Sequence, residues 1–165
     1  MKSVYNFVVK PRGERYNNTK KLDGGELILN TEIFNHQYVN REAEVISTPI
    51  IGDTDIKPGD TVVVHHNVFR RWHNVKGVEK NSRAYFDEDT YFINDDQIFL
   101  YKRKDKWIAP KGYCFVIPLK ATDQFNTESE KPLQGIVKYS DGTVEVGDLV
   151  GYRPSSEYEF IVDGE

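Results

Sequence analysis

A turn runs directly into a strand at Ile56-Lys-Pro-Gly-Asp-Thr-Val-Val-Val64. Proline suits the second position of such a turn, and the glycine that follows tolerates a positive φ. The β-branched residues after the turn favour an extended backbone, so we predict a strand over residues 61–66. The same combination of turn and strand recurs at Val144-Glu-Val-Gly-Asp-Leu-Val150. We therefore expect a fold built from a β unit that occurs twice.

Three further segments match between the two halves of the chain, in the same order. Tyr113–Ile117 matches Tyr5–Val9, Gly135–Val137 matches Glu44–Ile46, and Ser156–Phe160 matches Ser82–Phe86. Nothing in the second copy corresponds to Tyr91–Tyr101. We expect the second unit to be incomplete, with open strand edges that the first copy or a neighbouring subunit covers, unless the chain is shortened.

The remaining pattern is also that of strands. Short runs rich in valine and aromatic residues alternate with turn residues, and no long segment has helical periodicity. The runs that predict further strands are Val4–Lys10, 44–46, Arg83–Phe86, Thr90–Ile93 and Gln97–Tyr101. This spacing predicts an all-β protein containing a small barrel or sandwich. We place the first domain at residues 1–106 and the second at 107–165.

Composition excludes several classes of protein. The net charge of −4 argues against a nucleic-acid backbone as the main partner. No apolar run is long enough to cross a membrane and no secretory signal opens the chain, so we expect a cytoplasmic protein without a membrane partner. The single cysteine, Cys114, excludes a disulfide within the chain and a zinc site built from cysteines. We expect its thiol to be buried in a strand.

A polar segment with an apolar end occupies residues 12–31. The polar part is too poor in apolar side chains to offset the entropy of ordering it, and it ends in Gly24-Gly25 followed, after Glu26, by Leu27-Ile28-Leu29. A mobile loop that ends in three aliphatic residues suits an arm that folds onto a partner. The alternative is that Leu27–Leu29 is a strand entering the core.

These segments together resemble the GroES-type co-chaperonins, the ring-shaped lids of bacterial chaperonins. The resemblance runs from about Tyr5 to Lys102. It rests on the opening strand with Val8-Val9-Lys10-Pro11, the loop with Gly24-Gly25 and Leu27-Ile28-Leu29, the strand Arg41–Ile46, the turn and strand Lys57–Val63, and the closing hairpin and strand Tyr85–Tyr101. The chain departs from the family in its length and in the short segment Thr48–Asp55, which leaves no room for a long roof hairpin.

The resemblance implies a fold, a partner and a site. The fold would be a GroES-like small β-barrel with a mobile loop at 12–31, followed by a second, truncated GroES-like unit. Copies would form a homo-oligomeric ring of about seven, a heptamer. Leu27, Ile28 and Leu29 would bind a GroEL-type chaperonin, with Gly24 and Gly25 as the hinge. The chaperonin would bind ATP, and this chain would need no cofactor. A divergent phage-encoded member would fit these features.

Other clusters of polar residues do not indicate an active site. His65 and His66 are adjacent on a predicted strand and should point to opposite faces, so they and His73 do not predict a metal site. Asp87–Asp89 and Asp95-Asp96 fall in predicted turns without a partner nucleophile. We interpret Arg70-Arg71-Trp72 as a solvated loop or a subunit contact. We therefore expect a binding protein, not an enzyme. The alternative function is a structural or virion-associated protein that keeps the fold without binding a chaperonin.

Overall fold

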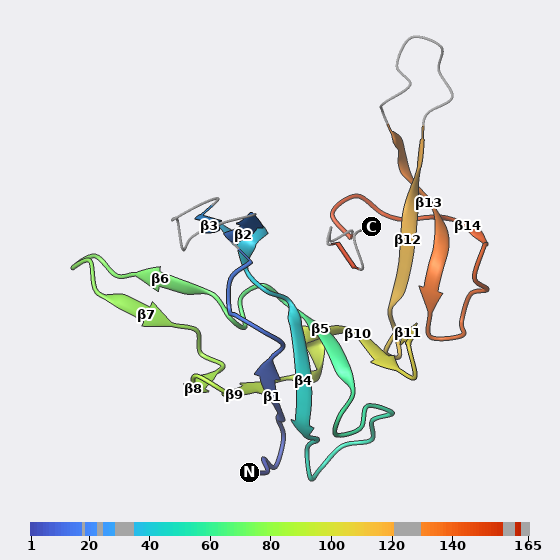
Figure 1. The fold of residues 1–165 in the computed structure, drawn as a ribbon. Helices are drawn as coiled ribbons and strands as arrows, with labels where there is room; N and C mark the ends of the chain where they lie inside the picture. Colours follow the sequence, from blue (N-terminus) through green and yellow to red (C-terminus); the bar gives the residue numbers. More distant parts are fainter. Residues whose placement is uncertain (18, 23–24, 29–34, 121–129, 157–160, 163–165) are drawn as a thin grey trace. The chain divides into compact units, whose positions relative to one another are not determined.

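The computed structural model describes residues 1–17, 19–22, 25–28, 35–120, 130–156 and 161–162 (Figure 1). The protein is all-β, as predicted, and the only helices in these residues are two single turns, η1 (His36–Tyr38) and η2 (Asp95–Gln97). The chain divides into two compact units, Met1–Pro110 and Lys111–Glu165. The predicted boundary after residue 106 cuts through strand β11 (Lys106–Ile108), which pairs with β10 (Ile98–Arg103). Residues 107–110 therefore belong to the first unit.

A seven-stranded antiparallel sheet forms the body of the first unit. Its strand order is β11-β10-β5-β4-β1-β9-β8. The strands not yet given are β1 (Phe7–Pro11), β4 (Glu42–Ser47), β5 (Thr61–Val64), β8 (Tyr85–Asp87) and β9 (Thr90–Ile93). The two outer strands, β11 and β8, do not pair with each other, so the described strands form an open sheet and not the closed barrel that we expected.

Side chains from the connecting segments pack onto this sheet and complete its core. Val9, Val45 and Val62 on the central strands are fully or almost fully buried in one core. Val68 and Phe69, from the connection after β5, are buried in the same core with no exposed surface. Burying each such side chain stabilises the fold by roughly 1.5–3 kcal/mol. Because side chains from the connections complete the core, the sheet does not have to close on itself to bury its apolar face.

Two short hairpins form separate two-stranded sheets. One consists of β2 (Thr19–Leu22) and β3 (Gly25–Ile28), and the other of β6 (Arg71–His73) and β7 (Glu79–Asn81). Neither β2 nor the β6–β7 hairpin is among the strands predicted from the sequence. Both are rich in charged residues, so their pairing carries little of the apolar alternation that marks a half-buried strand.

The second unit repeats three strands of the first. It consists of β12 (Cys114–Lys120), β13 (Glu130–Ser140) and β14 (Leu149–Gly151), paired in the order β12-β13-β14. The pairs Val9↔Val45 and Lys10↔Glu44 of the first unit correspond to Val116↔Val137 and Ile117↔Ile136 of the second. The pair Ala43↔Val62 likewise corresponds to Gly135↔Val150, and the bulge in the first pair of strands recurs at the same position. The three strands β1, β4 and β5 therefore recur as β12, β13 and β14.

The turn before the third strand recurs in detail. Gly59 and Gly147 have φ of 90° and 99°. The amide of Gly59 donates to the carbonyl of Val45, and that of Gly147 donates to the carbonyl of Val137, both over 2.8 Å. The aspartate after each glycine accepts a backbone N–H from the start of its own turn, at 2.8 Å for Asp60 and 3.1 Å for Asp148.

This register corrects two of the four sequence matches by one residue. Val9 corresponds to Val116, not to Ile117, and Val45 corresponds to Val137, not to Ile136. Short apolar runs of the two halves match equally well when one is shifted by a residue against the other. The strand pairing and the hydrogen bonds to the turn decide which alignment is correct. The match at the turn itself is correct. The match at 156–160 falls largely on residues 157–160, which lie outside the described residues.

Candidate functional site

The predicted chaperonin-binding residues lie on the β2–β3 hairpin. Gly25 is the first residue of β3, Leu27 lies within it and Ile28 is its last residue. The Leu27 side chain is 48% exposed and is not part of the core of the first unit. Gly24 and Leu29 lie outside the described residues. For Leu27 the structure therefore disagrees with the alternative that this segment enters the core.

The segment predicted as an unstructured loop contains paired strands. β2 and β3 are antiparallel, with Lys20 opposite Leu27 and Leu22 opposite Gly25. The sequence between the two strands is Asp23-Gly24, a dipeptide that favours two-residue hairpin connections. That dipeptide could have predicted the hairpin, whereas the polar composition of the segment predicts an unstructured loop.

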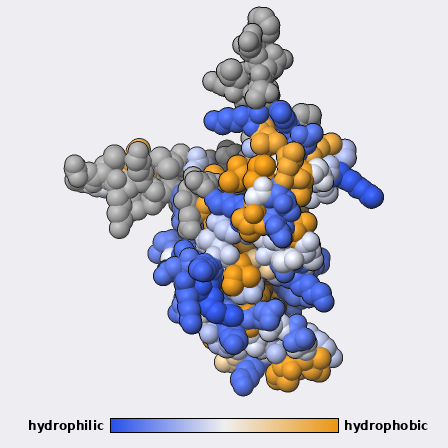
Figure 2. All heavy atoms as spheres, turned by 90° about the vertical axis from the view of Figure 1, so that its right-hand side faces the viewer, coloured by the Kyte–Doolittle hydropathy of each residue, from blue (hydrophilic) through white to orange (hydrophobic). Residues whose placement is uncertain are grey.

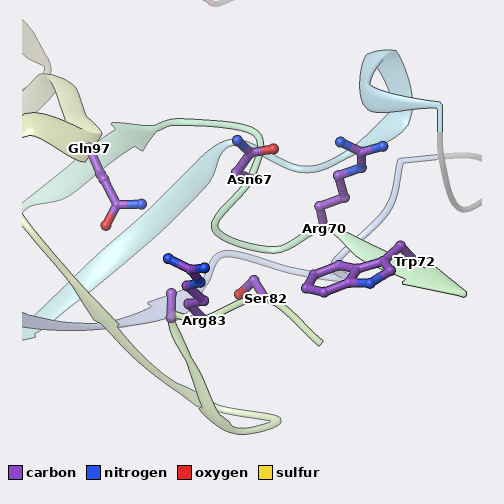
Figure 3. Close-up of a pocket in the computed structure, with 7 residues that line it drawn as sticks. Asn67, Arg70, Trp72, Ser82, Arg83 and Gln97 are labelled. Carbon is purple, nitrogen blue, oxygen red and sulfur yellow. The ribbon is translucent and has the colours of Figure 1, made fainter. Parts of the chain in front are cut away.

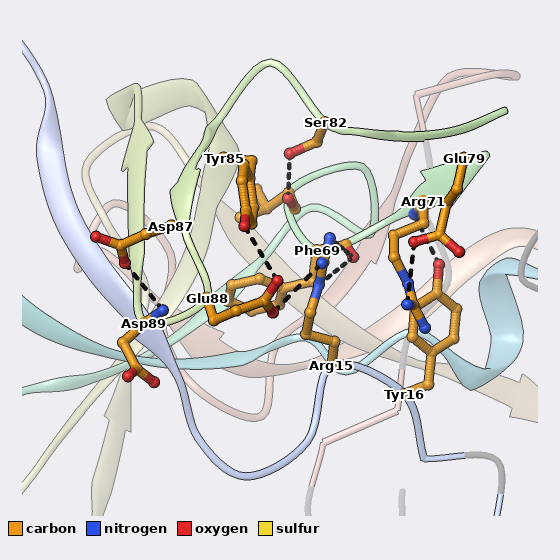
Figure 4. Close-up of polar contacts among 11 residues, drawn as sticks. Arg15, Tyr16, Phe69, Arg71, Glu79, Ser82, Tyr85, Asp87, Glu88 and Asp89 are labelled. Atoms are coloured by element: carbon orange, nitrogen blue, oxygen red, sulfur yellow. Dashed lines mark hydrogen bonds and ion pairs between the residues drawn. The ribbon is translucent and has the colours of Figure 1, made fainter. Parts of the chain in front are cut away.

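Arg15 holds the start of this arm against the body of the first unit (Figure 4). Its Nε and Nη2 atoms donate to the carbonyl oxygen of Phe69 at 3.3 and 3.1 Å. Its guanidinium lies 5.4 and 5.6 Å from the ring centres of Tyr85 and Tyr91, and its Nη1 is 3.7 Å from a carboxylate oxygen of Glu88. The side chain is only 10% exposed. Cation–π contacts of a largely desolvated guanidinium are stronger than those of an exposed one.

The two tyrosines of this contact have raised pKa values for different reasons. Burial raises the pKa of Tyr91 to about 12. The hydrogen bond that Tyr85 donates to Glu88, 3.0 Å long, is the main cause of its raised pKa. Both phenols are therefore neutral at physiological pH, and neither can serve as a base there.

Tyr16 makes the second contact of the arm with the body. Its hydroxyl oxygen accepts the backbone N–H of Arg71 at 2.7 Å, and the Arg71 guanidinium lies 5.0 Å from the centre of its ring (Figure 4). Tyr16 also forms an isolated antiparallel bridge with Val39, on the segment that returns from the arm. The strands that lead into and out of the arm are thus joined at this point.

Asn40 completes the connection between the two sides of the arm. Its side-chain nitrogen donates to the carbonyls of Arg12 and Glu14 at 3.0 and 2.9 Å, and its backbone N–H donates to the carbonyl of Arg15. We call Arg15, Tyr16 and Asn40 the arm root. The sequence analysis missed all three, because their partners lie far away in the sequence and no local motif marks them.

The histidines do not lie as predicted. β5 ends at Val64, so His65 and His66 follow the strand instead of alternating along it, and their rings lie 4.2 Å apart. His36 of η1 is next to them, 5.3 Å from His66, whereas His73 lies in β6. Burial and the neighbouring cationic groups lower the pKa of His66 to about 4. In the part of the chain that the structure describes, no group of three or more histidine, cysteine or acidic residues is arranged to hold a metal ion.

The acidic clusters organise turns. The carboxylate of Asp87 accepts the N–H of Asp89 at 3.0 Å, and that of Asp95 accepts the N–H of Asp96 at 2.9 Å. These contacts agree with the prediction that both clusters lie in turns. Cys114 lies in a strand as predicted, but its side chain is exposed because it is the first residue of β12, at the end of its sheet.

No helix in the described residues is long and apolar enough to cross a membrane. The β2–β3 arm is a hairpin with an exposed leucine, and its root is fixed to the body of the first unit. This chain matches no known protein-family model, no curated protein and no solved structure.

Proposed function

We propose that this chain is a co-chaperonin of the GroES type, which binds a GroEL-type chaperonin through its β2–β3 arm and assists ATP-dependent folding. The observation that carries the proposal is Leu27, a large aliphatic residue left 48% exposed on a hairpin outside the main sheet. An exposed aliphatic residue next to two more in the sequence, Ile28 and Leu29, is suited to bind an apolar groove on a partner.

The contacts of the arm root limit the positions that the arm can adopt relative to the body of the first unit. A flexible tether would spread the aliphatic end over many positions, whereas Arg15 and Tyr16 fix both the entry and the exit of the arm to the body. Burial of each aliphatic side chain on the chaperonin would contribute roughly 1.5–3 kcal/mol before the cost of ordering the arm. In a homo-oligomeric ring, several such arms would act together through effective concentration, so binding would be tight but reversible.

The first prediction is that Leu27→Asp abolishes binding to a GroEL-type chaperonin. A buried carboxylate without a partner would cancel the gain from burying the aliphatic end. The measurement is co-elution of the purified full chain with the chaperonin in the presence of ATP, followed by refolding of a stringent substrate.

Val75→Asp is the matched control, because Val75 is a fully exposed aliphatic residue on the turn of the other hairpin. It should bind like the unchanged protein. If the unchanged chain does not co-elute, or if the two variants behave alike, the proposal is wrong.

One observation favours the second candidate function, that of a structural protein. On the face where the first unit carries Lys10, Glu44 and Thr61, the second unit carries Ile117, Ile136 and Leu149 in the corresponding positions. Ile117 and Leu149 are exposed, and Figure 2 shows apolar side chains gathered over this unit. A structural protein would use such a row to contact a fixed neighbour. Protection of the arm from proteolysis by chaperonin and ATP would distinguish the two functions.

A further inference from the structure

A cleft in the first unit is lined in part by the β6–β7 hairpin (Figure 3). Its volume is about 620 Å³, and its lining includes Asn67, Arg70, Trp72, Ser82, Arg83 and Gln97. These residues come from the connection after β5 together with β6, from the connection between β7 and β8, and from η2. Three separate stretches of the chain therefore converge on a space large enough for a short peptide or a similar ligand.

The charged side chains that line the cleft are positive. Arg70 and Arg83 contribute two guanidinium groups, and no carboxylate is among the described residues that line the cleft. Arg15, Arg71 and Arg103 of the same unit each contact a carboxylate within 4.0 Å, but neither Arg70 nor Arg83 has such a partner among the described residues. The Nε atom of Arg70 is buried and has no hydrogen-bond partner there. A buried N–H without a partner is costly, and guanidinium groups without a carboxylate partner are suited to bind an anionic ligand through their outer nitrogens.

The neutral lining residues suit the same kind of ligand. The side-chain oxygen of Gln97 accepts the N–H of Asn94 at 3.0 Å, so its amide nitrogen is the end that is left to donate, and in Figure 3 that nitrogen points toward the other labelled residues. Ser82 donates its hydroxyl to the carbonyl of Val68, so it does not compete as a donor. The indole of Trp72 is 37% exposed and lies beside Arg70, where it provides a flat apolar wall.

The choice of anion follows from the charges around the cleft. The planar guanidinium group matches the geometry of carboxylates and of phosphates. A nucleic acid would bring further phosphates past Asp95 and Asp96, which directly precede Gln97, and onto a chain whose net charge is −4. A peptide can present a separate carboxylate to each of the two arginines and an apolar neighbour to Trp72. We propose that this cleft binds an acidic segment of a partner protein, with one Glu or Asp carboxylate at Arg70, another at Arg83 and an apolar side chain against Trp72.

The test uses the full chain and a fluorescein-labelled peptide of sequence Phe-Glu-Phe-Glu, with Phe-Gln-Phe-Gln as the neutral control. Fluorescence anisotropy should show saturable binding of the acidic peptide and binding at least about tenfold weaker for the neutral one. Arg83→Gln and Arg70→Gln should each weaken binding about tenfold, since each removes one charge-assisted contact. Arg153→Gln, which removes an exposed arginine of the second unit, should leave binding unchanged.

Circular dichroism of each variant separates loss of binding from loss of fold. Arg83 is the decisive position, because it is exposed and its side chain makes no hydrogen bond or ion pair with another described residue. Failure of the acidic peptide to bind, or equal binding to folded Arg83→Gln protein, overturns the proposal. It is also overturned if inorganic phosphate or oligothymidine binds with dependence on Arg83 while the acidic peptide does not. The co-chaperonin proposal rests on the arm and is unaffected by either result.

Discussion

At the scale of single residues, the two copies of the turn show how a contact from another strand changes the role of an aspartate. Asp60 and Asp148 occupy the same turn position and accept the same backbone hydrogen bond. Asp60 is buried and is also bound by Arg103 through both carboxylate oxygens, whereas Asp148 is exposed. Burial opposes ionisation of Asp60, but the hydrogen bonds from Arg103 and Lys57 outweigh it and lower the pKa of its carboxyl group.

We predict that Asp60→Asn lowers the free energy of unfolding by about 2 kcal/mol at pH 7, because Arg103 loses its charged partner. Since the folded pKa lies below the unfolded value of about 3.9, the stabilisation is complete above that value and is lost as the pH falls through the folded pKa. Urea unfolding followed by circular dichroism at pH 7 and at pH 3 measures both effects. Asp148→Asn should cost less than half as much at pH 7, and a cost as large as that of Asp60→Asn would contradict this account.

At the scale of elements, the arm depends on contacts made at its root and not on its own sequence. The β2–β3 hairpin is short and polar, and an isolated two-stranded hairpin is marginally stable in water. The contact of Arg15 with Phe69 joins the arm to the connection after β5, and the contact of Tyr16 with Arg71 joins it to the start of β6. Both partners lie more than fifty residues further along the chain. Asp23-Gly24 could have predicted the hairpin from the sequence, but nothing local could have predicted where the arm attaches.

We predict that Tyr16→Phe loosens the arm without unfolding the body. The change removes the oxygen that accepts the N–H of Arg71, at a cost of about 1 kcal/mol. Amide hydrogen exchange at Arg71 should become faster by roughly fivefold, which follows from that cost. Tyr38→Phe is the control, because the structure gives the Tyr38 hydroxyl no hydrogen bond to any other described residue, and it should leave this exchange rate unchanged. Unchanged exchange in Tyr16→Phe would show that the hydrogen bond does not hold the arm.

At the scale of the whole molecule, the three strands β1, β4 and β5 recur in the second unit with the same register but with a different surface. Lys10 and Glu44 form an ion pair of 3.2 Å across β1 and β4, and Ile117 and Ile136 occupy the same cross-strand positions in the second unit. The first unit extends its three strands to seven, whereas the pairing of the described residues in the second unit ends at three. Among the described residues, the second unit therefore has a smaller core than the first, with only Val137 and Val162 as buried hydrophobic residues.

We predict that the double variant Ile117→Lys with Ile136→Glu keeps the fold of the second unit and lowers its apolar surface. The new pair copies the register and chemistry of Lys10 and Glu44, so it should be tolerated at this position. Binding of the dye 1-anilinonaphthalene-8-sulfonate should fall clearly, while circular dichroism stays unchanged. Lys10→Ile with Glu44→Ile in the first unit is the reciprocal variant and should raise dye binding. Loss of the second unit's fold in the first variant would show that these isoleucines form a core.

Local sequence was enough to predict the strands that alternate apolar residues, the Pro-Gly-Asp turn and the recurrence of the β unit, because these depend on neighbours a few residues apart. Only tertiary structure decided the open strand order, the register of the repeat, the arm root and the cleft that Arg70, Arg83 and Trp72 line. Each of these joins segments that are distant in the sequence, and several joined residues are polar and lie in connections without periodicity. Their positions follow from how the core packs, which no single segment encodes.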